Sequence, residues 1–412
     1  MAARKDNKGR ALRKGEFQRA SDGKYVYGYT DPNGERRYIY SKDLAKLRER
    51  EKKLVKDQLD GLDVYVAGSA DLNFVYDRYI STKSELRSST YSNYTYMYDH
   101  YVRDGFGKKK IGEIKYSDVL QFYHDLLEKR ELQINTIDTI HTILHPTFQL
   151  AVRDGIIRTN PSDRVMAELR RKKTGNKKGI RHALTLEQQM AFMNYIAQSP
   201  VFVGWLPFFT VLLGTGCRIG EVVGLRRQDV DLEKRIININ HAMSYYPRRE
   251  DTYKCEFRVS LPKTEAGIRV LPMMQKVYEA LKGEYDRQME EGFSEAVVDG
   301  MTGFIFTNRF DTIHNPQAVN RAIKRIYEAH KAEEIVKAKN EHREPIIIPH
   351  FSCHHLRHTF CTRFCENETN VKVIQSVMGH KSIETTMDIY AEVSEAKKKE
   401  ALDNLSANLD IF

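Results

Sequence analysis

The chain has 412 residues, of which 41% are hydrophobic and 10% aromatic, enough apolar material for more than one globular core. Its longest apolar run, "VFVGWLPFFTVLLGTGC", contains Pro207 and several glycines, which argues against a membrane span. The first residues, "MAARKDNKGRALRKGEF", carry no apolar segment after their charges, and the five cysteines form no CxxC pair. These features exclude a secreted, disulfide-stabilised class, and we expect a soluble protein of a reducing compartment.

The net charge of +10 is unevenly distributed along the chain. Residues 1–54 hold sixteen Lys and Arg against eight Asp and Glu, so this segment alone contributes +8. A local excess of this size indicates a polyanionic partner, although a basic tail that only improves solubility has a similar composition.

Residues 15–41 show the pattern of a three-stranded antiparallel sheet. Asp22-Gly23 and Asn33-Gly34 separate runs of aromatic and β-branched residues, and such dipeptides are strong hairpin signals. We expect Ser41 to cap the helix that follows, "KDLAKLREREKKLVKDQL". The leucines expected to cover one face of the sheet are Leu44, Leu47, Leu54 and Leu59.

The opposite face of this sheet is expected to be basic. It would carry Arg19, Lys24 and either Arg36 or Arg37 among exposed tyrosines. A small basic sheet of this kind is suited to a DNA groove.

After Gly61 the pattern becomes helical up to residue 168. The tyrosines at positions 91, 94, 98 and 101 recur at helical spacing, and we expect them in the core rather than stacked on bases. Ser117 is expected to cap a further helix, and Pro146 to kink or split the helix around it.

Residues 169–182 have the composition of a basic linker, which either is a solvated tether or follows a phosphate backbone. The lysines that would contact DNA there are Lys172, Lys173, Lys177 and Lys178. A second large domain then begins with the capping box Thr185 to Gln188. It continues with a helix at 202–216, a helix that starts at Arg218, the strand "RIININ", two strands around a turn at 265–267, and mostly helices.

The sequence thus predicts a multidomain, mainly α protein with small β-sheets. Residues 1–68 form a three-stranded sheet plus helix, residues 69–168 an all-helical domain, residues 169–182 a linker, and residues 183–412 a mixed α+β domain with a C-terminal tail.

Four histidines lie in the short stretch "HFSCHHLRHTF". His354 and His358 are four residues apart and would share a helix face, as in HExxH zinc sites, with Cys361 or Cys365 as further ligands. No Glu follows His354, and the cation Arg357 lies between the two histidines, which disfavours a metal. The alternative is an anion site, since Arg357 offers a planar fork of donors for phosphate oxygens and His354 adds another N–H.

Two further segments carry candidate residues for such an anion site. Arg218 opens a helix directly after a long apolar segment, and Glu221, three residues on, could orient it. In "MGHKSIETTMDIY", Gly379 is expected to end one helix and Ser382 to cap the next, which places His380 in the corner between them. Tyr390 lies on the second helix, where core packing would be its default role.

In chain order these residues resemble the active-site signature of the tyrosine recombinases, the lambda-integrase type of site-specific recombinase. The matching motifs are "TGCRIGEVVGLRRQDVD", "PKTEAGIRVLP", "HHLRHTF" and "MGHKSIETTMDIY", and the residues are Arg218, Lys263, His354, Arg357, His380 and Tyr390. Residues 69–168 resemble the core-binding domain of that family. Residues 1–68 are similar to the arm-binding domain of integrases from conjugative transposons of Gram-positive bacteria.

The chain departs from the family pattern at a few positions. Cys217 and Met378 stand where leucine is common, and both are compatible with packing. The long polar segment from Ser244 to Arg258 leaves the hairpin register, and with it the choice of Lys263 over Lys254, open.

The resemblance implies a DNA integrase that cuts and rejoins DNA through a 3′-phosphotyrosyl intermediate, without metal, ATP or other cofactor. Tyr390 would be the nucleophile, Arg218 and Arg357 would hold the phosphate, and Lys263 would protonate the departing 5′-oxygen. His354 and His380 would donate hydrogen bonds or move a proton.

The implied partners are double-stranded DNA at core and arm sites, a homotetramer on DNA and, in some systems, an excisionase and host DNA-bending proteins. The tail after Tyr390, "AEVSEAKKKEALDNLSANLDIF", is expected to be an amphipathic helix that packs on a neighbouring protomer. The implied location is the bacterial cytoplasm, associated with the nucleoid.

Two other functions remain open from the sequence. A type IB topoisomerase has the same chemistry, but it needs no second sequence-specific DNA-binding domain. A non-catalytic DNA-binding regulator would not need Arg218, Arg357 and Tyr390 together.

Overall fold

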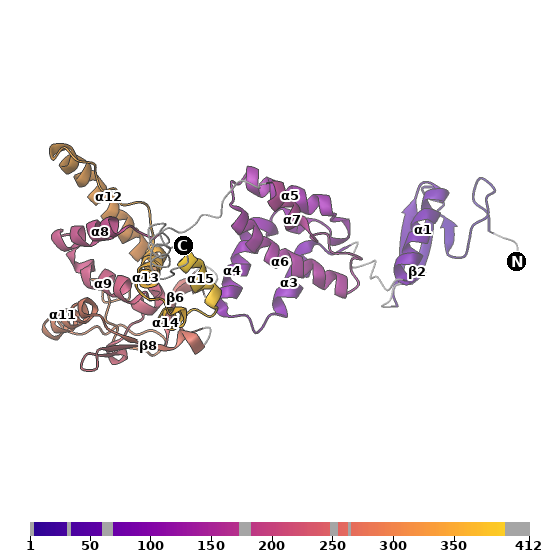
Figure 1. Ribbon diagram of the computed structural model, residues 1–412. Coiled ribbons are helices and arrows are strands. Elements are labelled where there is room, and N and C mark those ends of the chain that lie inside the picture. Colours follow the sequence, from indigo (N-terminus) through magenta and orange to yellow (C-terminus); the bar gives the residue numbers. More distant parts are fainter. Residues whose placement is uncertain are drawn as a thin grey trace, which may run out of the picture. The chain divides into compact units, whose positions relative to one another are not determined.

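The computed structural model describes residues 4–30, 34–59, 69–172, 183–247, 254–262 and 265–391 (Figure 1). Its internal contacts divide the chain into two units at Asn176 and Lys177. The architecture is mainly helical with small antiparallel sheets, and the predicted fold class is therefore confirmed. Within the described ranges, no helix is both long enough and apolar enough to cross a membrane.

The first unit begins with the predicted three-stranded sheet. Its antiparallel strands are β1 (Glu16–Gln18), β2 (Tyr25–Thr30) and β3 (Arg36–Ser41), in the order β1-β2-β3. Helix α1 (Leu44–Leu59) covers one face, where Leu44 and Leu47 pack with Tyr25. Leu54 is also buried, as predicted, whereas the side chain of Leu59 lies outside the described residues.

The predicted helix cap is wrong by two residues. Asp43 Oδ1 accepts from the amide nitrogens of Ala45 (2.8 Å) and Lys46 (3.1 Å), so Asp43 caps α1. Ser41 Oγ instead accepts from the amide of Asp43 at 3.1 Å. A carboxylate is favoured at a helix N-terminus because it faces the positive end of the helix dipole.

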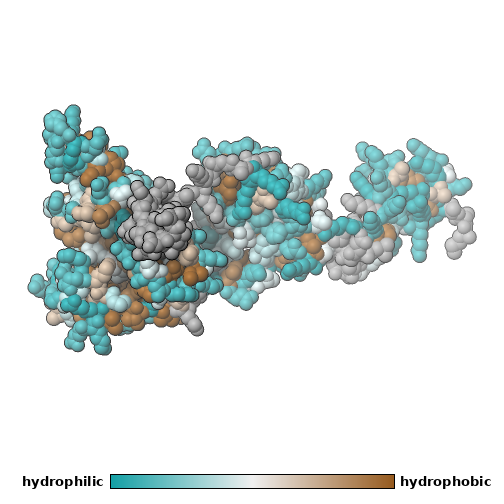
Figure 2. Space-filling model, in the orientation of Figure 1, coloured by the Kyte–Doolittle hydropathy of each residue, from teal (hydrophilic) through white to brown (hydrophobic). Residues whose placement is uncertain are grey.

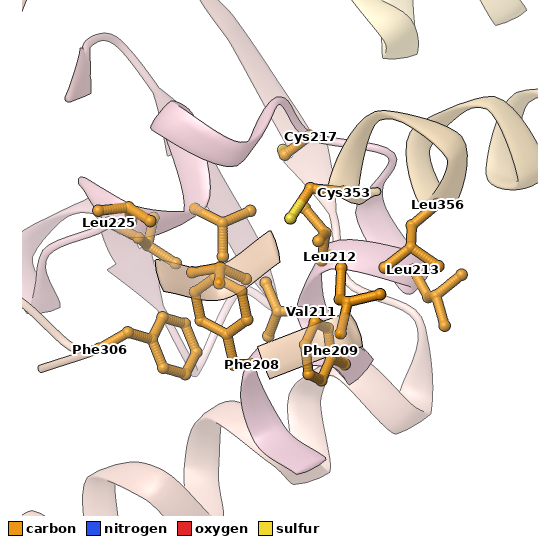
Figure 3. Packing of buried hydrophobic residues seen from close by; sticks show 14 of the residues in the cluster. Phe208, Phe209, Val211, Leu212, Leu213, Cys217, Leu225, Phe306, Cys353 and Leu356 are labelled. Carbon is orange, nitrogen blue, oxygen red and sulfur yellow. The ribbon is translucent and has the colours of Figure 1, made fainter. Parts of the chain in front are cut away.

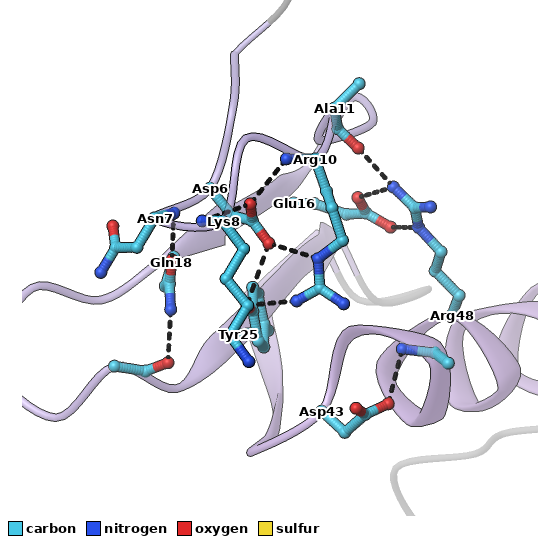
Figure 4. A network of polar contacts seen from close by, with 12 residues as sticks. Asp6, Asn7, Lys8, Arg10, Ala11, Glu16, Gln18, Tyr25, Asp43 and Arg48 are labelled. Carbon is cyan, nitrogen blue, oxygen red and sulfur yellow. Dashed lines mark hydrogen bonds and ion pairs between the residues drawn. The ribbon is translucent and has the colours of Figure 1, made fainter.

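Buried carboxylates hold the sheet, the helix and the N-terminal turn together (Figure 4). Glu16 is fully buried, and its Oε1 accepts from Arg48 Nε on α1 at 2.9 Å. Asp6 Oδ2 accepts from Arg10 Nε (2.8 Å) and from the hydroxyl of Tyr25 (3.0 Å). Each buried charge therefore has a partner, as burial requires.

The rest of the first unit is a helical domain with its own core. Its α-helices are α3 (Leu72–Ser81), α4 (Ser88–Tyr98), α5 (Tyr116–Glu128), α6 (Ile134–Arg153) and α7 (Val165–Lys172). Tyr98 is fully buried and stacks on Tyr76, with ring centroids 3.5 Å apart. Tyr91, Tyr94 and Tyr101 pack at the edge of the same core, which confirms their predicted structural role.

Three expectations for this region need correction. Helix α6 is not split at Pro146 and runs on to Arg153, since its buried apolar face outweighs the loss of one backbone hydrogen bond. Ser117 lies inside α5, where Asp118 accepts from the amide of Lys115 at 2.9 Å and closes the helix start. Residues 169–172, predicted as linker, complete α7, and residues 173–182 lie outside the described residues.

The second unit is built around helix α9 (Leu206–Thr215), whose apolar side chains are almost all buried (Figure 3). The surrounding helices are α8 (Leu186–Gln198), α10 (Ile219–Val223), α11 (Gln275–Glu291), α12 (Pro316–Asn340), α13 (Cys353–Asn367), α14 (Val371–Met378) and α15 (Ile383–Ala391). The close view also shows Cys217 and Cys353, which belong to this core. The capping box at Thr185 and Gln188 is present as predicted.

The second unit also has two small sheets. One contains β4 (Val230–Asp231), β5 (Ile236–Ile239) and β8 (Arg269–Pro272), and the other pairs β6 (Ala242–Pro247) with β7 (Cys255–Ser260). The strands predicted on either side of residues 265–267 exist, but they belong to different sheets. The prediction failed because strand partners come from distant segments, which a local turn signal does not reveal.

The N-terminal sheet and the second unit have separate cores, so we expect separate unfolding transitions. Leu47→Ala should lower the free energy of unfolding of the N-terminal sheet by about 2–5 kcal/mol, because Leu47 is fully buried between sheet and helix. Differential scanning calorimetry of the full chain measures this. Leu47→Met is the control, since it keeps the apolar volume. A shift of the transition of the second unit by the same amount would contradict independent cores.

Candidate active site

The C-terminal end of helix α14 is closed by a glycine turn. The last carbonyls of a helix have no partner within it and must be satisfied from elsewhere. Gly379 adopts φ +63°, which lets its amide donate to the Ser376 carbonyl (3.1 Å) and the His380 amide to the Gln375 carbonyl (3.2 Å). The three carbonyls that follow, of residues 377–379, remain for other donors.

Three arginines from three different segments donate to these carbonyls. Arg269 Nε, on β8, donates to the Val377 carbonyl at 2.8 Å. Arg357 Nη2, on α13, donates to the Met378 carbonyl at 2.6 Å. Arg218 Nη2, at the start of α10, donates to the Gly379 carbonyl at 3.1 Å. The negative end of one helix therefore gathers three cations that lie far apart in the sequence.

Arg357 also contacts the end of a second helix. Its Nη1 donates to the carbonyl of Gly216 at 2.6 Å, and Gly216 ends α9. Arg357 is almost fully buried, and burial together with the positive charge of Arg218 lowers its pKa to about 10. The guanidinium is still a cation at neutral pH, and two helix dipoles offset part of its desolvation.

Among the described residues, one carboxylate, that of Glu221, pairs with the arginines of this cluster. Glu221 is buried, and its Oε1 accepts from Arg218 Nη1 at 2.9 Å while Oε2 accepts from Arg269 Nη2 at 2.9 Å. Burial opposes ionisation of Glu221, but the hydrogen bond and charge of Arg269 hold its pKa below the usual value. Three arginines against one glutamate leave two net positive charges, a suitable environment for an anion with more than one charge.

His380 lies directly after the glycine turn and is buried. Its Nδ1 is 3.0 Å from the hydroxyl of Thr386, a fully buried residue on α15. Burial, followed by the positive charges of Arg357 and Arg218, lowers the pKa of His380 to about 4. The imidazole is therefore neutral at pH 7. With the Thr386 hydroxyl as donor to Nδ1, the N–H on Nε2 is available for a ligand.

The structure brings four of the six sequence-predicted residues into this region: Arg218, His354, Arg357 and His380. His354 is exposed one turn before Arg357 on α13, close enough that its charge contributes to the lowered pKa of His380. Tyr390 belongs to the last turn of α15, which packs against α13 and α14. The side chain of Tyr390 and the whole of Lys263 lie outside the described residues, and the alternative Lys254 is exposed and pairs with Glu256.

Two residues of the site were not foreseen. Arg269 was passed over as part of a strand, although an arginine between apolar neighbours in "GIRVLP" is a signal of a buried charge that needs a partner. Thr386 offered no comparable signal, because its role depends on how α15 folds back onto His380.

The remaining histidines of "HFSCHHLRHTF" have structural contacts. His355 Nδ1 is 3.0 Å from the hydroxyl of Ser352 and accepts from the Ser352 amide at 3.2 Å, closing the start of α13. Cys361 and Cys365 are buried in a small apolar cluster. Among the described residues, no group of three or more His, Cys, Asp or Glu is arranged to hold a metal.

The candidate DNA-contacting residues of the N-terminal sheet lie partly where predicted. The register places Arg36 on the open face with Tyr38 and Tyr40, and Arg37 on the helix-covered face. Arg19 lies over the ring of Tyr40, 5.3 Å from its centroid. Lys24 and Arg19 both pair with Asp22. This unit shows a mostly hydrophilic surface in Figure 2. In the linker, Lys173, Lys177 and Lys178 and the side chain of Lys172 lie outside the described residues.

Comparison with known proteins gives matches along the whole chain. Residues 182–397 match the phage integrase family, residues 1–58 the DNA-binding domain of Tn916 integrase, and residues 72–127 the N-terminal SAM-like domain of phage integrases. The transposase from transposon Tn1545 of Streptococcus pneumoniae is 31% identical over 404 residues, covering 95% of this chain and 94% of the relative. The transposase from transposon Tn916 of Enterococcus faecalis is 30% identical with the same coverage.

Solved structures agree with these matches. The Tn1549 transposon integrase in complex with a circular intermediate DNA aligns with a TM-score of 0.67 and 25% identity, over 82% of this chain and 100% of that chain. A lambda integrase tetramer bound to a Holliday junction aligns with a TM-score of 0.53 and 15% identity, over 92% and 95%, and shows a shared fold.

The buried, neutral His380 predicts acid sensitivity. A histidine with a lowered pKa binds its proton more tightly in the unfolded chain, so the unfolded state takes up more protons between about pH 6.5 and about pH 4. The free energy of unfolding of the second unit should therefore fall as the pH is lowered through this window.

In His380→Gln, the loss of unfolding free energy on acidification through this window should be smaller by on the order of 1–3 kcal/mol, since one pKa unit corresponds to about 1.4 kcal/mol. His314 and His330, whose pKa values burial also lowers, keep part of the slope in the variant. Urea denaturation at a series of pH values measures both profiles. A variant profile as steep as that of the wild type would show that His380 does not titrate as described.

Proposed function

The chain belongs to the phage integrase family and is a site-specific tyrosine recombinase of the conjugative-transposon type, and we propose that it cuts DNA with Tyr390 while Arg218 and Arg357 hold the scissile phosphate. The observation that supports these roles is the shared end of α14, where both arginines donate to neighbouring carbonyls. Each uses only two of its five N–H groups in the contacts described above, which leaves donors for phosphate oxygens.

The proposed reaction is a transesterification. The hydroxyl oxygen of Tyr390 attacks the phosphorus, the bond to the 5′-oxygen breaks, and a 3′-phosphotyrosyl bond and a free 5′-hydroxyl result. The phenolic proton must leave and a proton must reach the 5′-oxygen, for which we propose Lys263 as the donor. In the second step the 5′-hydroxyl of a partner strand attacks the phosphotyrosine, so the bond energy is conserved and no nucleotide cofactor is consumed.

The charges of the site are matched to this reaction. Negative charge on the non-bridging oxygens grows in the transition state, and preorganised cations stabilise it more strongly in a partly buried site than in water. We propose that His380, neutral at pH 7, donates a hydrogen bond to these oxygens and that the exposed His354 is a second donor. A neutral donor adds no further charge to two adjacent arginines.

Double-stranded DNA is the proposed partner of all three parts of the chain. The Tn1549 integrase was solved in complex with DNA, and residues 1–58 match a DNA-binding domain model. We propose that residues 1–68 bind arm sites through Arg19, Lys24 and Arg36, whereas residues 69–168 and 183–412 hold the core site with the basic linker between them. Arg37, on the helix-covered face, has a lesser role in this proposal.

A homotetramer on DNA is the proposed active assembly, and the second unit offers a surface for it. An apolar pocket of about 480 Å³ is lined by Leu213, Leu271, Met274, Phe360 and Val377. Figure 2 shows hydrophobic side chains gathered on this part of the unit, near β8. We propose that it receives the tail of a neighbouring copy, whose leucines at 402, 405 and 409 recur at helical spacing.

Two alternatives differ in their products. A type IB topoisomerase would relax supercoiled DNA without joining two DNA molecules, and a regulator would form no covalent adduct. The resemblance to transposases over 95% of the chain, including the N-terminal domain, favours the recombinase.

Tyr390→Phe should abolish the covalent adduct with a nicked suicide substrate that carries the core site. Phenylalanine keeps the ring but has no hydroxyl to attack phosphorus. Adduct formation is followed by denaturing gel electrophoresis, and Tyr246→Phe, at the end of β6, is the matched control that should retain it. An adduct of unchanged yield in Tyr390→Phe would assign the nucleophile elsewhere. Relaxation without joint molecules would favour the topoisomerase.

Deletion of residues 397–412 should reduce cooperative assembly on DNA by at least about tenfold, because it removes the proposed ligand of the apolar pocket. Met274→Lys, in the pocket lining, should have the same effect, while Met289→Lys, another exposed methionine, on α11, should not. Mobility-shift titrations with paired sites measure the cooperativity. Unchanged cooperativity in the deletion variant would refute the exchange.

A further inference from the structure

Arg269 is a buried cation that binds only protein groups. Its side chain on β8 is 5% exposed. Nε donates to the Val377 carbonyl, Nη1 to Glu221 Oε1 (3.3 Å) and to the Gly267 carbonyl (3.3 Å), and Nη2 to Glu221 Oε2 (2.9 Å) and to Cys217 Sγ (3.6 Å). These five contacts use all five N–H groups of a guanidinium. Arg269 therefore has no donor left for a phosphate.

The acceptors of Arg269 all belong to segments that carry candidate catalytic residues. Val377 precedes the turn that holds His380, and Glu221 is the carboxylate partner of Arg218. Gly267 lies four residues after Lys263. A Cβ at Gly379 would lie only 3.0 Å from Arg269 Nη1 and 2.9 Å from the Ala266 carbonyl, so this loop and the glycine turn are in tight contact.

We propose that Arg269 is a positioning residue of the recombinase site: by sharing Glu221 with Arg218, it keeps the Arg218 guanidinium free to hold phosphate and fixes the loop after Lys263 against α14. This inference rests on the proposed role of Arg218.

The role of Arg269 depends on how the Glu221 carboxylate is shared between two arginines. In the structure the Arg218 guanidinium donates to Oε1 of Glu221 at 2.9 Å, whereas Arg269 donates to Oε2 at 2.9 Å and to Oε1 at 3.3 Å. The backbone amide of Arg218 also donates to Oε2, at 2.9 Å. Without Arg269, both oxygens of the buried carboxylate would have a single guanidinium to pair with, and a bidentate pair with Arg218 is the favourable outcome. That pair would neutralise Arg218 and occupy donors that the phosphate needs.

Stability alone is a weak explanation for this arrangement. Burial of an ion pair costs about as much desolvation free energy as the attraction returns, and apolar residues of similar volume often serve equally well. An ionic network is better explained if it also orients the half-exposed side chain of Arg218.

The test is a double-mutant cycle on the rate of adduct formation at saturating suicide substrate, with the dissociation constant for DNA measured separately. Arg269→Gln should slow adduct formation by about 10–100-fold, less than the roughly 100–1000-fold loss expected for a donor that contacts the transition state itself, with a dissociation constant within about twofold of wild type. The double variant Arg269→Gln, Glu221→Gln should be faster than Arg269→Gln alone, since no buried carboxylate is left to sequester Arg218.

Arg269→Lys keeps the charge with fewer donors, so its rate of adduct formation should lie between those of the wild type and Arg269→Gln. If Arg269→Gln fails to fold, Arg269→Lys replaces it in the test. The matched control is Arg226→Gln. Arg226 forms a similar buried bidentate pair with Asp229 in the same unit, at 3.0 and 3.1 Å, and its loss should lower the melting temperature without changing the rate at saturation.

Three results would each overturn the proposal. The first is a double variant whose rate of adduct formation falls by the product of the two single losses. The others are a wild-type rate in folded Arg269→Gln and a loss of rate explained by DNA affinity alone. An adduct that persists in Tyr390→Phe would instead place the fault in the proposed function.

Discussion

The geometry of the candidate site depends on the carbonyls at the end of helix α14 that have no partner within the helix. The last carbonyls of a helix lack partners within it; here the amides of Gly379 and His380 in the glycine turn satisfy two, and three arginines satisfy the next three. Because each acceptor is fixed by the backbone, the arginines are placed relative to one another by a rigid element rather than by their own flexible chains. Gly379 is essential to this, since its φ of +63° and its contact with Arg269 both exclude a side chain.

The same arrangement explains the electrostatics. Buried guanidinium groups repel one another, and the cost is offset by the dipoles of α9 and α14 and by the one carboxylate, Glu221. The charge is left incompletely balanced, and burial together with this excess positive charge keeps His380 neutral. Before DNA binds, the arginines of the site repel one another. The excess positive charge then attracts the phosphate most strongly in the transition state, when the negative charge on the phosphate is greatest.

Local patterns in the sequence predicted elements better than the contacts between them. Turn dipeptides and leucine spacing were sufficient for the N-terminal sheet and α1, and the tyrosine spacing correctly indicated a core. The predicted split of the helix at Pro146 was wrong, because tertiary packing of an apolar face outweighs a local cost.

The site shows the same division between local and distant information. Motif spacing identified Arg218, Glu221, His354, Arg357 and His380, which the fold brings to one place. Arg269 and Thr386 could not be found this way, because each matters only through a partner more than five residues away in the chain, and that partner is known only after folding.

The placement of Tyr390 adds a dynamic constraint. Helix α15 is short, and residues 383–385, 387 and 388 are exposed, while Thr386 is its one fully buried side chain among those described. Few buried contacts mean a low free energy of local opening compared with α13, which carries Arg357 and has seven buried residues. The arginines proposed to bind phosphate thus lie in the well-packed core, and the proposed nucleophile Tyr390 belongs to the helix with fewer buried side chains. Thr386 joins α15 to His380, so the contact that holds this helix also orients the histidine proposed to donate to the phosphate. The helix of the proposed nucleophile and the proposed phosphate site should therefore become ordered together.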